Sequence, residues 1–165
     1  MGKKKKSVYI ETSIVSYYVA RPTRDIIVLA HQQLTREWWD GVAEHYRSFI
    51  SEIVLDEAGR GNRFAARRRL EALAGFQRLA MTAAVEKLTT TYMKKLHLPK
   101  GALRDAAHLA MTVAHEIDYL LTWNCRHLAN GEIIRKVWDI NKAAGLHIPV
   151  ICTPVELVGG DANVS

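Results

Sequence analysis

Short runs of apolar and β-branched residues alternate along this chain with longer segments whose apolar residues recur at helical spacing. The apolar runs are SVYIE at 7–11, RSFIS at 47–51, FQRLAM at 76–81, DYLLTWN at 118–124 and PVICTP at 149–154. Helical patterns occupy 13–19, 24–46, 63–74, 82–96, 102–116 and 131–144, and a further helix begins at Glu52 and ends at Gly59 or Gly61. Such alternation is typical of βαβ units. We therefore expect an α/β fold, a three-layer α/β/α sandwich with a mostly parallel central sheet.

The size and composition of the chain fit one globular domain. With 165 residues, 48% of them hydrophobic and 24% charged, it is long enough to bury a core. We expect a single domain at 7–158, a basic N-terminal tail at 1–6 and a C-terminal tail at 159–165. No apolar stretch approaches the roughly 20 residues of a membrane span, and the segment after Lys3–Lys6 lacks the features of a signal peptide. We expect a cytoplasmic protein with no membrane contact.

The charge of the chain is basic but unevenly spread. Of the formal net charge of +6, Lys3–Lys6 contribute four, which leaves +2 for the rest of the chain. Arg60, Arg63 and Arg67 share one helical face at i, i+3, i+7 spacing. Such a face is either a phosphate-binding surface or a plain solvated one. The cysteines, Cys125 and Cys152, form no CxxC pair, so neither zinc nor redox chemistry is indicated.

Acidic and amide side chains lie where the predicted strands end. Glu11 ends the first strand, Asn124 ends the fourth, and Glu57 lies on the helix that follows the second. Asp105 lies near the start of the helix after LPKGAL. In an open parallel sheet, ligands bind beyond the carboxyl ends of the strands. A single acid in the first turn of a helix often only complements the helix dipole. A functional site is therefore indicated by these residues together and not by any one of them.

Carboxylates gathered without matching lysines repel one another unless a divalent cation neutralises them. Hard oxygen ligands suit Mg²⁺ or Mn²⁺, and such a site suits hydrolysis of a phosphodiester. The chain has no GxGxxG or P-loop sequence and no GxSxG serine motif. The sequence therefore favours a metal-dependent nuclease over a nucleotide-cofactor enzyme or a serine hydrolase.

Four stretches, in this order, make the chain similar to PIN-domain proteins, and specifically to VapC-type toxins of toxin–antitoxin pairs. They are SVYIETSIVSYY, ISEIVLDEAGRG, LPKGALRDAAHLAMTVAHEIDYLLTWNCRHLAN and PVICTPVEL. The resemblance implies a Mg²⁺- or Mn²⁺-dependent endoribonuclease that cleaves RNA, a small antitoxin as partner, and a homodimer. The residues that match the family's motifs are Glu11 with Ser13, Glu57, Asp105, and Thr122 to Asn124.

This chain departs from the family pattern at two positions. Glu11 stands where aspartate is commonest, which keeps the charge and shifts the metal. Asn124 stands where many members have a further aspartate, which removes a charge. We expect one metal held by Glu11, Glu57 and Asp105, with Asn124 orienting water or completing the site.

Several residues have two interpretations that the sequence leaves open. Glu52 or Asp56 replaces Glu57 if the phase of their helix differs from that assumed. Ser13, like Thr122, supports a metal ligand or caps a helix, and the two roles are compatible. His108 either transfers protons or is a buried structural histidine. Arg126 and His127 are candidates for phosphate contact, and Trp123 for stacking on a base.

Two further functions remain open. One is a non-catalytic PIN scaffold that binds nucleic acid or protein. The other, a doubly wound domain that binds a small molecule, is the least favoured because no phosphate-cradling loop is present.

Overall fold

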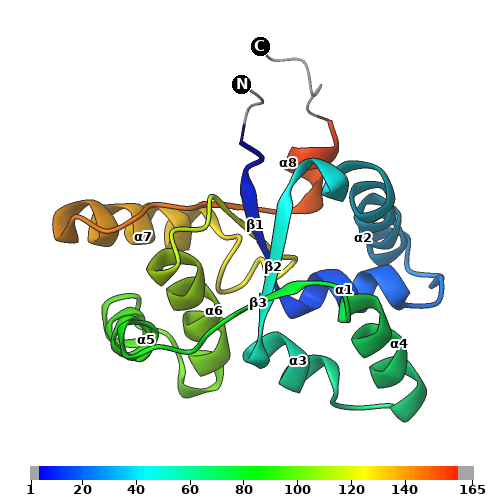
Figure 1. Ribbon diagram of the computed structural model, residues 1–165, viewed down its shortest axis with the longest axis horizontal. Coiled ribbons are helices and arrows are strands. Elements are labelled where there is room, and N and C mark those ends of the chain that lie inside the picture. Colours follow the sequence, from blue (N-terminus) through cyan, green and yellow to red (C-terminus); the bar gives the residue numbers. More distant parts are fainter. Residues whose placement is uncertain (1–3, 160–165) are drawn as a thin grey trace.

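Five parallel strands form one sheet in the computed structural model, which describes residues 4–159 (Figure 1). The sheet order is β3-β2-β1-β4-β5. The strands are β1 (Ser7–Ile10), β2 (Arg47–Ser51), β3 (Gln77–Leu79), β4 (Tyr119–Leu121) and β5 (Val150–Cys152). The predicted tails lie partly outside the described residues, at 1–3 and 160–165. The predicted α/β class is confirmed, and the described sheet is parallel throughout.

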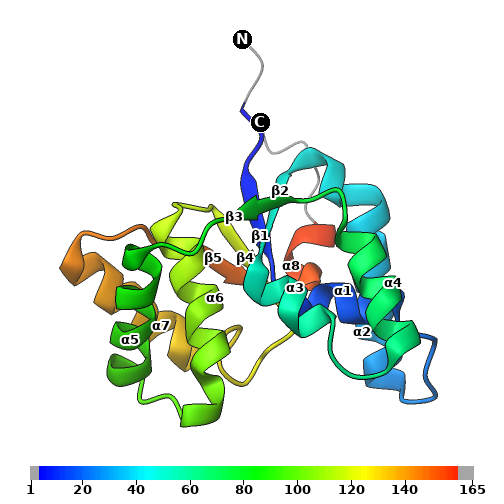
Figure 2. The same ribbon diagram turned by 60° about the horizontal axis from the view of Figure 1, so that its bottom comes forward.

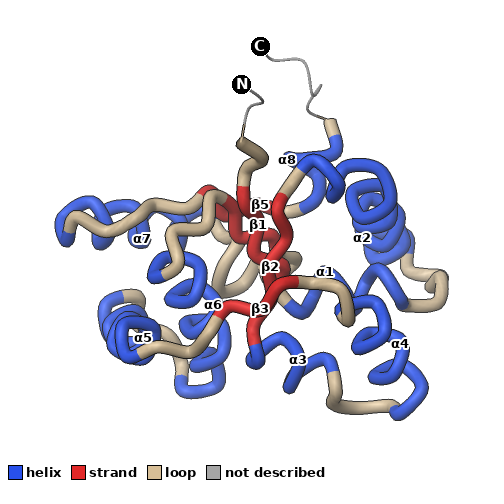
Figure 3. Tube along the Cα trace, in the orientation of Figure 1, coloured by secondary structure: helices blue, strands red, loops and turns tan. Residues whose placement is uncertain are grey.

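Helices cover both faces of the sheet. They are α1 (Thr12–Val19), α2 (Ile26–Glu37), α3 (Glu52–Ala58), α4 (Arg63–Leu73), α5 (Ala83–Lys95), α6 (Leu103–Ala114), α7 (Gly131–Ala144) and α8 (Pro154–Val158). Figures 1 and 2 show α1, α2, α4 and α8 on one side and α5, α6 and α7 on the other, and α3 follows the lower end of β2 in Figure 1. The strands lie between the two helical layers (Figure 3). This is the predicted three-layer sandwich. No helix within 4–159 has both the length and the apolar character that a membrane crossing needs.

Strand β1, near the N-terminus, is the central strand of the sheet. Val8, Tyr9 and Ile10 are fully buried, as expected for a strand with neighbours on both edges and helices on both faces. Ile10 pairs with Leu121 of β4. The chain runs from β1 to β2 and β3 on one side, then crosses to β4 on the other. The sheet order therefore reverses beside β1, and the carboxyl ends of the strands at such a reversal are a usual ligand site.

The long helix predicted at 24–46 is shorter than expected. α2 begins after Asp25, whose side chain accepts hydrogen bonds from the first-turn amides, and it ends at Glu37. A π-helical turn, Trp38–Val42, and a 3₁₀ turn follow. Ile27 is largely exposed, whereas Trp38 is fully buried. The irregular turns at 38–45 accompany the burial of Trp38 in the core. Tertiary packing of this kind cannot be predicted from the spacing of apolar residues along the sequence.

The helix α8 was not predicted. It begins at Pro154, after Thr153, whose side chain and that of Glu156 form a capping box. The TPVE motif, with proline at the first helical position, is a helix-start signal that was available in the sequence.

Candidate metal centre

Glu11 lies directly after β1 with its carboxylate almost completely buried. Its Oε1 accepts a 3.1 Å hydrogen bond from the Ser13 amide, so Glu11 is the N-cap of α1. Its Oε2 accepts hydrogen bonds from the Ser13 hydroxyl and, at 2.6 Å, from Thr122 Oγ1. The prediction that Ser13 caps α1 is wrong because the longer Glu11 side chain reaches the amide first. Ser13 instead supports Glu11, and its Oγ accepts the Trp123 amide at 2.8 Å.

Glu57 lies near the end of α3 and turns toward α1 and α6. Its Oε1 accepts a 2.7 Å hydrogen bond from Thr12 Oγ1 and lies 2.6 Å from Nε2 of His108. Burial alone would raise the pKa of Glu57. The contacts with His108 and Thr12, together with the positive charge of Arg104, outweigh burial and hold the pKa below its usual value. Glu57 is therefore a carboxylate at neutral pH.

The neighbouring acids on α3 face away from Glu57. Asp56 is exposed and forms ion pairs with Arg60 at 2.8 Å and with Arg104 at 2.6 Å. Glu52 is also exposed and lies 3.3 Å from Arg78. Of the three acids, only Glu57 approaches Glu11 and His108.

His108 is fully buried and connects Glu57 to the core of the sheet. Its Nδ1 lies 2.8 Å from the Tyr9 hydroxyl, which in turn lies 2.7 Å from Ser51 Oγ. Tyr9 and Ser51 are also fully buried. Burial raises the pKa of Tyr9 well above its usual value, so the phenol stays protonated. A continuous chain of side-chain hydrogen bonds therefore runs from Ser51 through Tyr9 and His108 to Glu57.

Glu11, Glu57 and His108 form a group that can hold a metal ion. One ligand atom from each lies within 4.8 Å of the others, and no other histidine, cysteine or acid within residues 4–159 forms such a group of three. His108 Nε2 lies 4.0 Å from Glu11 Oε1. Two carboxylates and one imidazole are suitable ligands for a divalent first-row cation, so the donor set fits a metal.

Asp105 does not belong to this group, although we expected it beside Glu11 and Glu57. It lies three residues before His108, on the same face of α6, and its Oδ2 is 2.7 Å from His127 Nδ1. Both side chains are about a fifth exposed. The place predicted for Asp105 is taken by His108, which lies one turn deeper along the helix. Asp105 and His127 instead form a partly exposed pair that joins α6 to the loop after β4.

The loop after β4 holds Thr122 in the site but directs its next two side chains elsewhere. Asn124 Oδ1 accepts hydrogen bonds from the backbone amides of Arg126, at 3.3 Å, and His127, at 3.0 Å. Asn124 therefore stabilises the following turn. The Trp123 indole is only 9% exposed and stacks on His31, with ring centroids 4.0 Å apart. The prediction that Trp123 stacks on a base is wrong because the protein already covers its ring.

The predicted basic face is divided between paired and unpaired arginines. Arg60 is paired with Asp56, and Arg67 with Glu71 at 2.7 Å. Within 4–159, the guanidinium groups of Arg21, Arg63 and Arg68 form no hydrogen bond or ion pair with another residue. The predicted contact Arg126 is exposed. The unpaired cations, rather than the whole face, are available to an anionic ligand.

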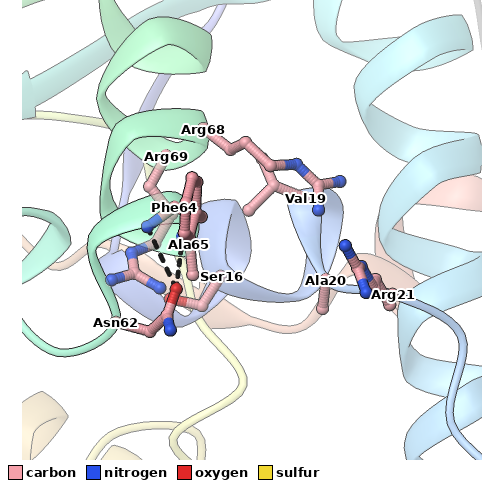
Figure 4. Close-up of a pocket in the computed structure, with 9 residues that line it drawn as sticks. All are labelled: Ser16, Val19, Ala20, Arg21, Asn62, Phe64, Ala65, Arg68 and Arg69. Atoms are coloured by element: carbon pink, nitrogen blue, oxygen red, sulfur yellow. Dashed lines mark hydrogen bonds between the residues drawn. The ribbon is translucent and has the colours of Figure 1, made fainter.

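A groove of about 510 Å³ lies between α1 and α4 (Figure 4). Arg68 extends over it from α4, and Arg21 lies opposite (Figure 4). Phe64 at its edge is 78% exposed. The groove is lined by Ser16, Val19, Ala20, Arg21, Asn62, Phe64, Ala65, Arg68 and Arg69. The groove does not contain Glu11 or Glu57, but α1 connects the two, because it begins at the metal group and ends at the groove.

No protein-family model matches this chain, and no curated protein matches it in sequence. A functional assignment therefore depends on the geometry of the site and on the motifs.

Proposed function

We propose that this protein is a metal-dependent endoribonuclease, the toxin component of a VapBC-type pair. One observation carries the proposal. Glu11 and Glu57, from distant parts of the sequence, place ligand atoms within 4.8 Å of each other and of His108. This group lies beyond the carboxyl end of β1, beside which the order of the parallel sheet reverses, and that is the usual ligand site of such a sheet. Two carboxylates this close favour a bound cation.

The residues of the metal group and those beside it have distinct proposed roles. Glu11 and Glu57 hold Mg²⁺ or Mn²⁺, which supplies Lewis-acid activation of water and of the scissile phosphate. Thr122 orients the Glu11 carboxylate, and Thr12 orients that of Glu57. Asp105 and His127 form a partly exposed pair, three residues before His108 on α6, whose proposed role is to bind water or the leaving group.

The unpaired arginines give the proposed enzyme its RNA contacts. Arg68 extends from α4 over the groove, and Arg21 lies opposite (Figure 4). Arg63, at the start of α4, likewise has no carboxylate partner among the described residues. Guanidinium groups bind phosphate oxygens in a bidentate manner. The exposed ring of Phe64 offers a stacking surface for an unpaired base.

Cleavage of labelled RNA by the purified protein tests the proposal. We expect cleavage with Mn²⁺ and none with EDTA. Glu11→Gln and Glu57→Gln each remove one charge with little change of shape, and each should lower the cleavage rate at least about 100-fold. Glu52→Gln is the matched control, because it makes the same change on an exposed acid of α3. Unchanged cleavage by both site variants, or cleavage in EDTA, contradicts the proposal.

A non-catalytic binding module is the second candidate. One observation favours it, namely that protein groups already donate hydrogen bonds to both oxygens of Glu11, so its burial is compensated without a cation. Such a module would bind RNA or a protein partner and cut nothing. A gel-shift assay beside the cleavage assay separates the two functions.

The antitoxin partner, the homodimer and the cytoplasmic location belong to the same proposal. Sedimentation equilibrium tests the dimer. Co-expression with the product of an adjacent small reading frame tests the antitoxin, since a true partner should abolish cleavage in the same assay.

A further inference from the structure

We propose that His108 is itself a ligand of the cation at Glu11 and Glu57, and that Tyr9 and Ser51 are positioning residues that set its tautomer. The inference builds on the metal centre of the proposed function, but it does not require that the protein cut RNA. It replaces the expected set of oxygen ligands with a mixed set of two carboxylates and an imidazole.

The position of the imidazole supports direct ligation. His108 is fully buried, and its Nε2 faces both acids, 2.6 Å from Glu57 Oε1 and 4.0 Å from Glu11 Oε1. A histidine that served only packing would have no need to direct a ring nitrogen between two carboxylates. A cation between these three atoms would neutralise the acids and use the one nitrogen that faces them.

The other ring nitrogen has the kind of partner that metal-bound histidines require. A ligating histidine usually donates from its second nitrogen to an oriented acceptor, which fixes the ring and the tautomer. Here Nδ1 lies 2.8 Å from the Tyr9 hydroxyl, and Tyr9 is held by Ser51 at 2.7 Å. All three side chains are fully buried. The support is therefore made of protein groups that water does not replace.

The hydrogen-bond chain can reverse without any net transfer of charge. Without a cation, Nε2–H donates to Glu57, the Tyr9 hydroxyl donates to Nδ1, and Ser51 donates to Tyr9. With a cation, Nε2 presents its lone pair, and the ring proton resides on Nδ1 and is donated to Tyr9. Tyr9 then donates to Ser51. Both arrangements hold the same number of protons: the ring proton moves from Nε2 to Nδ1 by exchange with water when the cation binds, and the two hydroxyl groups rotate to match.

The mixed donor set predicts which cations bind. Imidazole nitrogen suits Mn²⁺, Co²⁺ and Zn²⁺ better than Mg²⁺, which prefers oxygen and keeps its waters. We therefore expect the protein to bind Mn²⁺ more tightly than Mg²⁺, and the preference to depend on His108.

Pulsed electron paramagnetic resonance of the full-length protein loaded with Mn²⁺ tests the ligation. We expect a ¹⁴N hyperfine coupling from a directly bound imidazole, lost in His108→Asn. His115→Asn is the matched control, because His115 is the C-cap of the same helix and its side chain forms a hydrogen bond with the Ala80 carbonyl oxygen, away from the acids. The control should keep the coupling. Absence of the coupling in the unmodified protein, or its survival in His108→Asn, overturns the inference.

Tyr9→Phe tests the positioning role, and if His108→Asn fails to fold, the presence or absence of the ¹⁴N coupling in the unmodified protein still tests the ligation. Tyr9→Phe should keep the ¹⁴N coupling but lower the Mn²⁺ affinity by calorimetry about 10-fold or more, with a smaller change for Mg²⁺. An unchanged Mn²⁺ affinity overturns the role of Tyr9.

The outcomes separate this inference from the proposed function. Nitrogen coupling without RNA cleavage supports the inference and contradicts the nuclease. Cleavage abolished by EDTA, with no nitrogen coupling, supports the nuclease and contradicts the inference.

Discussion

Thr122 donates a 2.6 Å hydrogen bond to Oε2 of Glu11, although the two residues are far apart in the sequence. They meet because β1 and β4 are neighbours in the sheet and end together. Thr122 is fully buried, and its Oγ1 also accepts the Asn124 amide at 2.9 Å. One hydroxyl thus fixes both the carboxylate and the loop beside it.

Replacing Thr122 by valine should loosen Glu11 without changing the volume of the side chain. We expect the Mn²⁺ affinity to fall about 10- to 100-fold and the free energy of unfolding to fall by about 1–3 kcal/mol. Calorimetry and urea unfolding measure the two effects. Thr122→Ser keeps the hydroxyl and should recover most of the affinity. Equal affinities for the valine and serine variants would show that this hydrogen bond does not position Glu11.

Metal binding should raise the thermal stability of the folded chain. A ligand at about 100 times its dissociation constant adds about 2.7 kcal/mol. Differential scanning calorimetry with Mn²⁺ and then EDTA should show a rise in Tm and its reversal. Glu57→Gln should remove the rise, whereas Glu52→Gln should keep it. A rise of equal size in both variants would place the binding elsewhere.

The pairing of the arginines predicts which of them bind RNA. Arg63→Ala and Arg68→Ala should weaken binding, and each should reduce the slope of log affinity against log salt by about 0.7, the value for one phosphate contact to a single strand. Arg60→Ala and Arg67→Ala are the matched controls, because their guanidinium groups already pair with Asp56 and Glu71. Fluorescence anisotropy over a range of salt concentrations measures the slopes. Equal effects of all four substitutions would contradict the distinction.

Asp118 should make the fold sensitive to acid. Its Oδ2 accepts two 2.8 Å hydrogen bonds from Ser7, and Lys6 lies 3.6 Å from Oδ1. Burial alone would raise the pKa of Asp118, but the contacts with Ser7 and Lys6 outweigh it and lower the pKa. The stability that ionised Asp118 contributes is therefore complete above the ordinary aspartate pKa. It is lost as the pH falls through the lowered pKa that Asp118 has in the folded state.

Urea unfolding at several pH values checks this contribution. Asp118→Asn should be less stable than the unmodified protein at neutral pH by about 1 kcal/mol, and the difference should shrink in acid. Asp139→Asn, which changes an exposed aspartate on α7, should show neither effect. A constant difference at all pH values would exclude the carboxylate as the cause.

Much of the architecture was predictable because each buried strand is a compact apolar run. Val8, Tyr9 and Ile10 place apolar side chains on both faces of the strand, which is the pattern typical of a central parallel strand. The predicted ends of the elements were less accurate. They depend on which residue captures the free amides of a helix, as Glu11 does for α1.

The site was only partly predictable. Glu11 and the helix that carries Glu57 follow adjacent parallel strands, so the topology brings them together, and the phase of α3 selects Glu57 over Glu52 and Asp56. The choice between Asp105 and His108 does not, because both lie on one face of α6, and the packing of α6 against α3 decides which reaches Glu57. Tyr9 did carry a signal, since a buried tyrosine hydroxyl needs a partner. The burial of Trp123 and the hydrogen bonds of Asn124 to the following turn depend on the geometry of the loop, which the sequence does not reveal.

The order of the strands has a consequence for protein synthesis. Glu11 lies in the first tenth of the chain, but its partners lie on α3, on α6 and after β4. A nascent chain therefore lacks Thr122, which holds the Glu11 carboxylate in place, until β4 has left the ribosome and entered the sheet beside β1.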